Sequence, residues 1–298
     1  MKIMNRRYIL VTAAKNEGGN LSNLIQSVAE QTIKPMLWVI ADDGSSDNTP
    51  EIIKEAKGKY EWIQSLRLNS EVTVRDIGLH LSSVMMKVTE FAIGYCGRNE
   101  IKYEYIGNID GDIIIEPKFF EKLIIEFEKD DKIGIAGSGT QYIKGDNIIQ
   151  PEGGEEEPSG GDMLIRRGCF EDCGGLKSSA SPWDSVLKAK ARLRGWKTRR
   201  FEEITATETR DPMSTESRWM GYLNHGKGAY YLNTNPIHVI VKGIIYSFKK
   251  PYYIGIPYLL GYFADFVQRK DQIDDNEIKE YYWNKYKELF RKLIKMRL

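Results

Sequence analysis

The chain has 298 residues, which is enough for one large α/β domain with an extension or for two small domains. A composition of 41% hydrophobic and 29% charged residues is that of a folded protein, and the formal net charge of +1 argues against a nucleic-acid partner. The three cysteines are too few for a disulfide framework and favour a reducing compartment.

Neither a secretory signal nor a membrane-spanning helix is predicted. The apolar run at residues 8–14 ends at Lys15 without a cleavage site and is better explained as a buried strand. The longest uncharged apolar stretch near the C-terminus, residues 251–263, is shorter than the roughly 20 residues that a spanning helix needs. We therefore expect a cytoplasmic protein.

The first half of the chain alternates apolar runs with segments of helical periodicity. The runs that we predict to be strands lie at residues 8–13, 37–41, 63–68, 103–109 and 133–136. Helical spacing of apolar residues follows them at residues 21–28, from 49, at 74–95 and from 117. This alternation predicts a mostly parallel sheet flanked by helices, which is a Rossmann-like α/β fold.

The second half changes character twice. Residues 151–162 are rich in Gly, Glu and Pro and are predicted to form a mobile loop. The elements expected after it are a helix from about residue 183 to Gly195, a strand at 196–201 and a helix at about 215–225. From about residue 237 the segments are aromatic and apolar. We predict a first domain at residues 1–235 and a helical, aromatic-rich extension at residues 236–298.

Polar clusters follow three of the predicted strands. They are Lys15-Asn16-Glu17, Asp42-Asp43-Gly44-Ser45 and Asp110-Gly111-Asp112. Ligands of an open parallel sheet bind beyond the carboxyl ends of its strands, so we expect these clusters to share one crevice. Two aspartates around a glycine suit Mg²⁺ or Mn²⁺ bridging a diphosphate, although ordinary turn chemistry is the alternative explanation of that motif alone.

Seven motifs along residues 6–235 occur in a characteristic order. They are Ala13-Ala14-Lys15-Asn16-Glu17, Ala41-Asp42-Asp43-Gly44-Ser45-Ser46-Asp47-Asn48-Thr49, Asp110-Gly111-Asp112, Arg166-Arg167, Gly174-Gly175-Leu176, Trp183-Asp184 and Arg194-Gly195-Trp196. In order and spacing they resemble the motifs of family 2 glycosyltransferases. The resemblance implies a GT-A fold, a nucleotide-diphospho-sugar donor linked to UDP or GDP, and inversion at the anomeric carbon.

The resemblance also implies a donor site. Asp42, with Asp43 beside it and the backbone around Ala13 and Glu17, would hold the base and ribose of the donor. Glycan or lipid-linked glycan acceptors are expected for the family, and assembly of a polysaccharide or glycolipid is the expected context.

Metal and base roles are implied for three further acids. Asp110 would contact the ribose or the metal, and Asp112 would bind Mn²⁺ or Mg²⁺ directly. Asp184 would be the general base that takes the proton of the acceptor hydroxyl, with the metal as the Lewis acid.

The sequence departs from the family pattern in three places. Trp183 stands where a glutamate is usual, which suggests that its ring stacks on the acceptor sugar. Residues 74–78 replace a usual nucleotide-binding stretch, so the identity of the nucleotide stays open. A usual histidine is missing near Glu208, which is then either a metal ligand or a solvated partner of Arg210.

Positive charge for the leaving diphosphate is expected from Arg218 and Lys227 around a Gly226-Lys227-Gly228 turn. The alternative is a helix C-cap at Gly226 with Lys227 in solvent. His80 has no metal-like partner nearby in the sequence, so core or surface packing is its default interpretation.

The C-terminal region combines tyrosines and lysines at a density that suits a membrane interface. Docking of residues 237–263 at the inner face of the cell membrane would serve a lipid-linked acceptor. The alternatives are packing against the first domain or a homodimer seam. Residues 278–298 fit an amphipathic basic helix.

Two other functions compete with sugar transfer. A sugar-phosphate nucleotidyltransferase would need a glycine-rich, basic loop after the first strand, whereas this loop has one lysine and one acid. A non-catalytic subunit of polysaccharide assembly would have lost the acids that are present here at Asp42, Asp110, Asp112 and Asp184.

Overall fold

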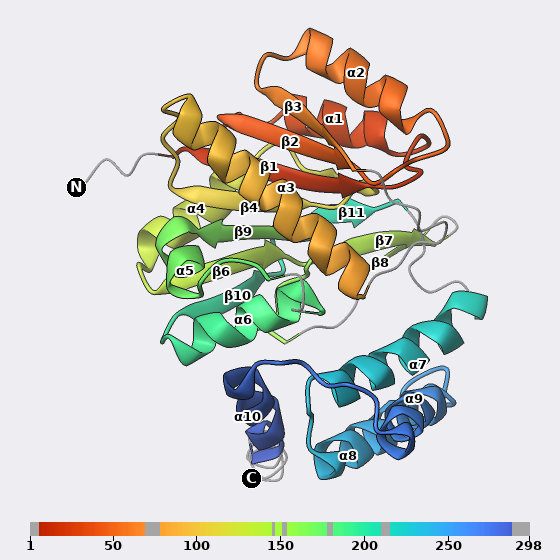
Figure 1. Cartoon of the computed structure of the whole chain (residues 1–298). Coiled ribbons are helices and arrows are strands. Elements are labelled where there is room, and N and C mark those ends of the chain that lie inside the picture. Colours follow the sequence, from red (N-terminus) through yellow and green to blue (C-terminus); the bar gives the residue numbers. More distant parts are fainter. Residues whose placement is uncertain are drawn as a thin grey trace. The chain divides into compact units, whose positions relative to one another are not determined.

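The computed structural model of the chain describes residues 6–68, 78–144, 147–150, 154–177, 181–209 and 215–287 (Figure 1). The chain forms two compact units, Met1–Asp211 and Pro212–Leu298, each of which is considered by itself. The domain boundary expected after residue 235 falls inside the second unit. Among the described helices, none has the length and hydrophobicity that crossing a membrane requires.

A seven-stranded sheet forms the centre of the first unit (Figure 1). Its strands are β1 (Tyr8–Ala14), β2 (Leu37–Asp42), β3 (Ile63–Arg67), β4 (Tyr105–Ile109), β6 (Ile133–Ser138), β9 (Asp162–Arg166) and β10 (Lys197–Phe201). They lie in the order β10-β6-β9-β4-β1-β2-β3. All neighbours are parallel except β9, which is antiparallel to both β4 and β6. The predicted fold class is confirmed.

Continuous apolar sequence explains the central strands. Every residue of β2 and of β4 is buried. Runs of this kind form strands that are covered on both faces, whereas strands with one solvated face alternate apolar and polar residues. The covering layers are helical, because parallel neighbours must be joined by crossover connections.

Helices cover both faces of the sheet (Figure 1). On one face, α1 (Leu21–Ala29), α2 (Thr49–Lys59) and α4 (Phe119–Lys129) share a core cluster with Leu10 and Trp38. On the other, α3 (Leu79–Arg98), α5 (Arg167–Asp172) and α6 (Trp183–Leu193) pack around Val11 and Val39. Crossovers through these layers return the chain so that β1, β2, β3 and β4 end at the same edge of the sheet.

A second sheet consists of four short strands. They are β5 (Ile113–Ile115), β11 (Ala206–Glu208), β7 (Gln141–Lys144) and β8 (Asn147–Ile149), in that order. The sequence analysis missed these strands, because three or four residues are too few for a recognisable alternation. Pairing of β5 with β11 places Glu208 opposite Ile113, directly after the Asp110-Gly111-Asp112 motif.

The second unit is helical, as the sequence predicts for the extension. Its helices are α7 (Thr215–Tyr231), α8 (Pro236–Ser247), α9 (Gly255–Gln268) and α10 (Asn276–Asn284). The expected end of a helix at Gly226 is wrong, because α7 continues to Tyr231. A Cβ at Gly226 would lie 2.0 Å from the carbonyl oxygen of Tyr258. Glycine therefore admits the backbone of α9 here and does not cap α7. Residues 288–298 of the expected basic helix lie outside the described residues.

Gly134 in β6 leaves no room for a side chain. A Cβ there would lie 2.5 Å from Sγ of Cys169 and 2.9 Å from Cβ of Trp196. We predict that Gly134→Ala lowers the free energy of unfolding by about 1–3 kcal/mol, because overpacking displaces neighbouring side chains. Urea denaturation measures this change.

The control is Gly58→Ala in α2, where an added Cβ meets nothing within 4 Å. Alanine favours a helix, so this variant should gain about 0.5–1 kcal/mol. Equal destabilisation by the two substitutions would contradict the packing argument.

Candidate functional site

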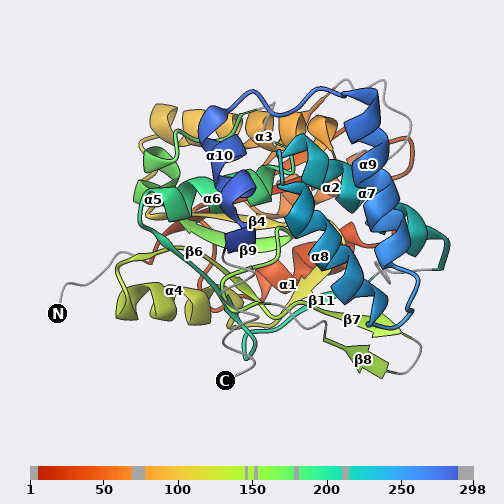
Figure 2. The same cartoon turned by 90° about the horizontal axis from the view of Figure 1, so that it is seen from below.

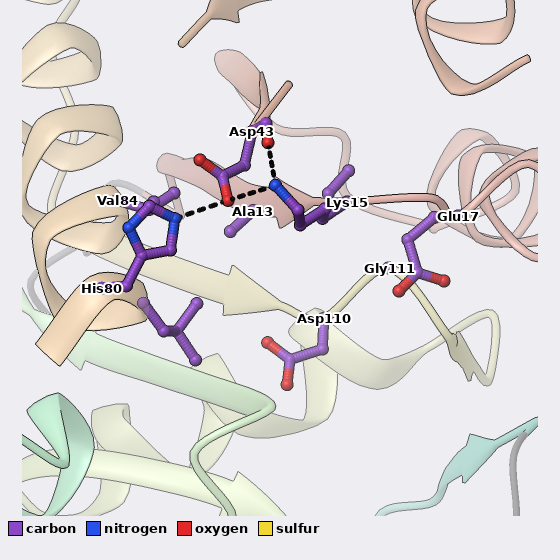
Figure 3. A pocket seen from close by; sticks show the side chains of 10 residues that line it. Ala13, Lys15, Glu17, Asp43, His80, Val84, Asp110 and Gly111 are labelled. Carbon is purple, nitrogen blue, oxygen red and sulfur yellow. Dashed lines mark hydrogen bonds and ion pairs between the residues drawn. The ribbon is translucent and has the colours of Figure 1, made fainter. Parts of the chain in front are cut away.

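The carboxyl ends of β1, β2 and β4 meet at one open pocket (Figure 3). The start of α3 supplies the remaining wall. The lining residues are Ala13, Ala14, Lys15, Glu17, Asp43, His80, Leu81, Val84, Asp110 and Gly111. Each of the three polar clusters that follow the strands contributes at least one of them.

Asp43 forms one end of this pocket and is almost completely buried. Nζ of Lys15 donates to the backbone carbonyl of Asp43 at 2.6 Å and lies 3.4 Å from its Oδ2. Nε2 of His80 donates to the same Oδ2 at 2.7 Å (Figure 3). Among the described residues, Oδ1 of Asp43 has no hydrogen-bond partner. A buried acceptor without a donor is costly, so this oxygen suits a ligand N–H or O–H group.

Asp42 does not line the pocket. Its Oδ1 accepts the N–H of Ser45 at 2.9 Å, and its Oδ2 forms an ion pair with Arg67. These contacts fix the turn after β2, in which Gly44 adopts a φ of 70°. The structure therefore brings Asp43 into the pocket and uses Asp42 to shape the turn.

Asp110 faces the pocket beside Glu17 (Figure 3). Its backbone N–H donates to the carbonyl of Gly161 at 2.8 Å, and Nδ2 of Asn108 lies 3.3 Å from its Oδ1. A Cβ at Gly111 would lie 2.9 Å from Cγ of Glu17, so glycine is what allows the two segments to approach. Asp110 and Glu17 thus line the same pocket.

Asp112 and Glu208 lie apart from this lining. Asp112 is only 3% exposed, and its carbonyl accepts both the N–H and the hydroxyl of Thr209. Glu208, in β11, pairs across the sheet with Ile113. Arg210, the alternative partner of Glu208, lies outside the described residues, as do residues 74–77. The ligand roles of Asp112 and Glu208 stay predictions.

Asp184 stands in the first turn of α6, close to the segment that holds Asp110. Nζ of Lys188, one turn later, donates to Oδ2 of Asp184 at 2.9 Å and to the carbonyl of Pro158 at 2.9 Å. A Cβ at Gly160 would lie 2.9 Å from Oδ2 of Asp184. A Cβ at Gly161 would lie 2.9 Å from Oδ2 of Asp110. Gly160 therefore contacts Asp184, and the next residue, Gly161, contacts Asp110.

Trp183 is packed in the interior. It is 6% exposed and belongs to the core cluster that includes Val11, Met85 and Phe170. Stacking on an acceptor sugar would require this packing to open, so we do not include Trp183 in the site.

Two expected cations belong to the second unit. Arg218 and Lys227 lie on α7, and their role at the donor stays a prediction. Within the described ranges, no three His, Cys, Asp or Glu side chains are grouped so that they could hold a metal ion by themselves. Mg²⁺ is usually bound by one or two carboxylates together with substrate phosphates, which needs no such group.

The sequence analysis missed His80 and gave Lys15 no role. His80 is the second residue of α3 and lies 37 residues from Asp43 in the chain. No local pattern could pair them. Lys15 did carry a signal, because it follows a buried strand directly, at the place where ligands bind in an open sheet.

Comparison with known proteins identifies a family to which the sequence of the first unit is similar. The profile described as "Glycosyl transferase family 2" matches residues 9–175, which include Asp43, Asp110 and the Gly160–Gly161 pair. Chondroitin synthase and hyaluronan synthase of Pasteurella multocida are each 24% identical over 140 residues. That match covers 47% of this chain but only 13% of either synthase.

Solved structures share the fold at low sequence identity. The mannosyltransferase PcManGT from Pyrobaculum calidifontis, in complex with GDP-Man and Mn²⁺, is 12% identical, with a TM-score of 0.54. The match covers 87% of this chain and 70% of that protein. TarS 1–349 of S. aureus, in complex with UDP-GlcNAc, is 13% identical with a TM-score of 0.53, over 93% and 79% of the two chains.

Asp162, the first residue of β9, is a completely buried acid behind the Gly160–Gly161 pair. Its Oδ2 accepts the hydroxyls of Ser138 and Thr140. Burial raises the pKa of Asp162 from 3.8 to about 7, although the two hydroxyls partly offset this shift. Between about pH 4 and pH 7 the folded protein therefore holds a proton that the unfolded chain has lost.

We predict that this proton makes the metal-free protein less stable as the pH rises through that window. The stabilising contribution is complete below about pH 4 and lost above about pH 7, and it is on the order of 4 kcal/mol. Asp162→Asn, which keeps the neutral shape, should remove most of this dependence. Unfolding free energies of both proteins measured across the window test it, and an unchanged slope in the variant would refute the assignment.

Proposed function

Because the chain belongs to glycosyl transferase family 2, we propose that its pocket binds a UDP- or GDP-linked sugar. The enzyme would transfer this sugar, with inversion at the anomeric carbon, to a hydroxyl group of the acceptor. The acceptor would be a glycan or a lipid-linked glycan. The family makes the chain a glycosyltransferase that depends on a nucleotide sugar. This membership favours sugar transfer over the nucleotidyltransferase and the non-catalytic subunit.

One observation carries the proposal. Three acids that are far apart in the chain lie close to one edge of the sheet. Asp43 and Asp110 line the same pocket. Asp184 contacts Gly160, and the adjacent Gly161 contacts Asp110. A donor that spans the pocket from Asp43 to Asp110 would present its sugar toward Asp184.

Asp43 is the proposed contact for the nucleobase. Uracil and guanine both carry a ring N–H that can donate to a carboxylate, and Oδ1 of Asp43 has no other donor among the described residues. Lys15 and His80 hold the opposite oxygen, so the carboxylate is already oriented before a donor binds. Ala13 and Glu17 line the adjoining wall, where the ribose would lie.

Mn²⁺ or Mg²⁺ would fit at Asp110. Its carboxylate faces the pocket, oxygen ligands suit both ions, and Gly111 leaves space for a phosphate to approach. PcManGT, which shares the fold, was solved with GDP-Man and Mn²⁺. A bound ion would supply positive charge to the departing diphosphate. Asp112 is less suited to direct ligation than Asp110, because it is buried outside the pocket lining.

Asp184 is the proposed general base. Its carboxylate would accept the proton of the acceptor hydroxyl while that oxygen attacks the anomeric carbon and the nucleoside diphosphate leaves. Lys188 would hold the carboxylate in position through its bonds to Asp184 and Pro158. A single displacement of this kind needs one base and no covalent nucleophile.

We predict that Asp184→Asn lowers turnover by about 10²–10⁴-fold, because an amide cannot take the proton. Donor binding should change little. Release of nucleoside diphosphate from UDP- and GDP-sugars with Mn²⁺ measures turnover, and titration calorimetry measures donor binding. If donor binding falls while turnover per bound donor does not, Asp184 is not the base.

Gly160→Ala should also reduce turnover, by about tenfold or more, because its Cβ would displace the carboxylate of Asp184 from the reacting position. Donor affinity should remain close to that of the wild type. Gly154→Ala is the matched control, since a Cβ there meets only an ordinary contact at 3.8 Å. A loss of turnover as large in the control would show that the close contact at Gly160 is not responsible.

A further inference from the structure

The helices α8 and α9 of the second unit (Figure 2) carry large apolar side chains that are exposed to solvent. We call this set the α8–α9 apolar face. It consists of Ile237, Ile240, Ile244, Phe248, Ile256, Leu260 and Val267, each between 42% and 80% exposed. Single exposed apolar residues are normal, whereas a group of this size marks an interaction surface.

Helical spacing makes the face continuous along each helix. Ile237, Ile240, Ile244 and Phe248 follow one another at intervals of three or four residues, and Ile256, Leu260 and Val267 at intervals of four and seven. The exposed positions of α1, in the first unit, are instead polar: Ser22, Asn23 and Gln26. The polarity of α8 and α9 is therefore the reverse of that of an ordinary surface helix.

The inner sides of the two helices are already occupied. On α8, Val239 and Gly243 are buried, and a Cβ at Gly243 would lie 2.7 Å from the side chain of Leu259 on α9. On α9, Tyr258 and Tyr262 are buried in an aromatic cluster with Tyr230 of α7. Turning either helix to hide its isoleucines would break these close contacts.

Basic residues outnumber acidic ones in the segment that carries the apolar face. Residues 236–270 contain five basic side chains and a single acidic one, although the whole chain is almost neutral. The basic residues are Lys242, Lys249, Lys250, Arg269 and Lys270. Lys249 and Lys250 are exposed in the turn between the helices, and Arg269 and Lys270 are exposed where α9 ends.

We propose that the α8–α9 apolar face docks on an anionic phospholipid bilayer. The isoleucines, Leu260 and Phe248 would enter the boundary between headgroups and acyl chains, and the lysines would meet the lipid phosphates. Charge complementarity favours this occupant over a second copy of the chain. In a symmetric dimer, the basic residues of one copy would face the same residues of the other and repel them. The proposal does not depend on the donor site or on the reaction assigned to it.

Vesicle co-sedimentation of the full chain tests the proposal without measuring activity. Vesicles of phosphatidylcholine and phosphatidylglycerol in equal parts are compared with vesicles of phosphatidylcholine alone. We expect binding to the anionic vesicles that weakens as salt is added. The double variant Ile240→Glu/Ile244→Glu should bind about tenfold or more weakly, because carboxylates on this face resist entry into the lipid.

Ile148→Glu is the matched control, since it makes the same change at an exposed isoleucine of the first unit. It should bind anionic vesicles as the wild type does. A second pair separates charge from apolar area: Lys249→Glu/Lys250→Glu should weaken binding, whereas Lys54→Glu/Lys57→Glu on exposed positions of α2 should not.

Three results would overturn the proposal. The wild type could fail to bind anionic vesicles, the apolar double variant could bind them as well as the wild type, or both vesicle types could be bound equally. Sedimentation equilibrium without lipid identifies the rival occupant: a dimer that the Ile240→Glu/Ile244→Glu variant abolishes would assign the face to a second copy. Circular dichroism establishes that each variant is folded.

Discussion

At Gly160 and Gly161 the backbone passes between two acidic side chains with no space for a Cβ on either residue. The carbonyl of Gly161 accepts the N–H of Asp110, and that of Gly160 accepts the side chain of Asn108. This segment leads into β9, whose first residue, Asp162, stands opposite Ile109 at the end of β4. The antiparallel strand within an otherwise parallel sheet thus brings the end of β4 and the start of α6 to the same place.

Two acids at this edge of the sheet, Asp43 and Asp184, each have basic side chains as partners. Lys15 and His80 contact Asp43, and Lys188 contacts Asp184. The charge of each of the two lysines is therefore largely balanced by an acid of the fold before a ligand arrives. A nucleoside diphosphate is strongly anionic, and binding it beside Glu17 and Asp110 would be repulsive without added positive charge. This balance is the physical reason for including a divalent cation at Asp110 in the proposed function.

Sequence alone predicts most strands of the sheet and the polar clusters at their carboxyl ends, because buried parallel strands are continuous apolar runs that end at polar residues. It could not decide between Asp42 and Asp43, since adjacent residues after a strand point in different directions and the turn selects the one that faces the pocket. His80 depends on how the start of α3 meets β2, which no local pattern records. The expected acceptor contact of Trp183 rested on its position beside Asp184 in the sequence, which does not record that the first turn of α6 directs this ring into the core.

The second unit shows why tyrosines can form an interior while isoleucines remain outside. Its helices approach at glycines, so that a Cβ at Gly261 would lie 2.0 Å from the carbonyl of Leu223. Such contact fixes which side of each helix faces inward. The tyrosine hydroxyls are satisfied there, since Tyr230 donates to the carbonyl of Lys270 and Tyr262 to that of Thr234. The aliphatic side chains are left on the opposite side, where water disfavours them by about 25 cal/mol per Å² of apolar surface. An apolar medium removes that cost without disturbing the glycine contacts, which is why the inverted polarity and the close packing belong together.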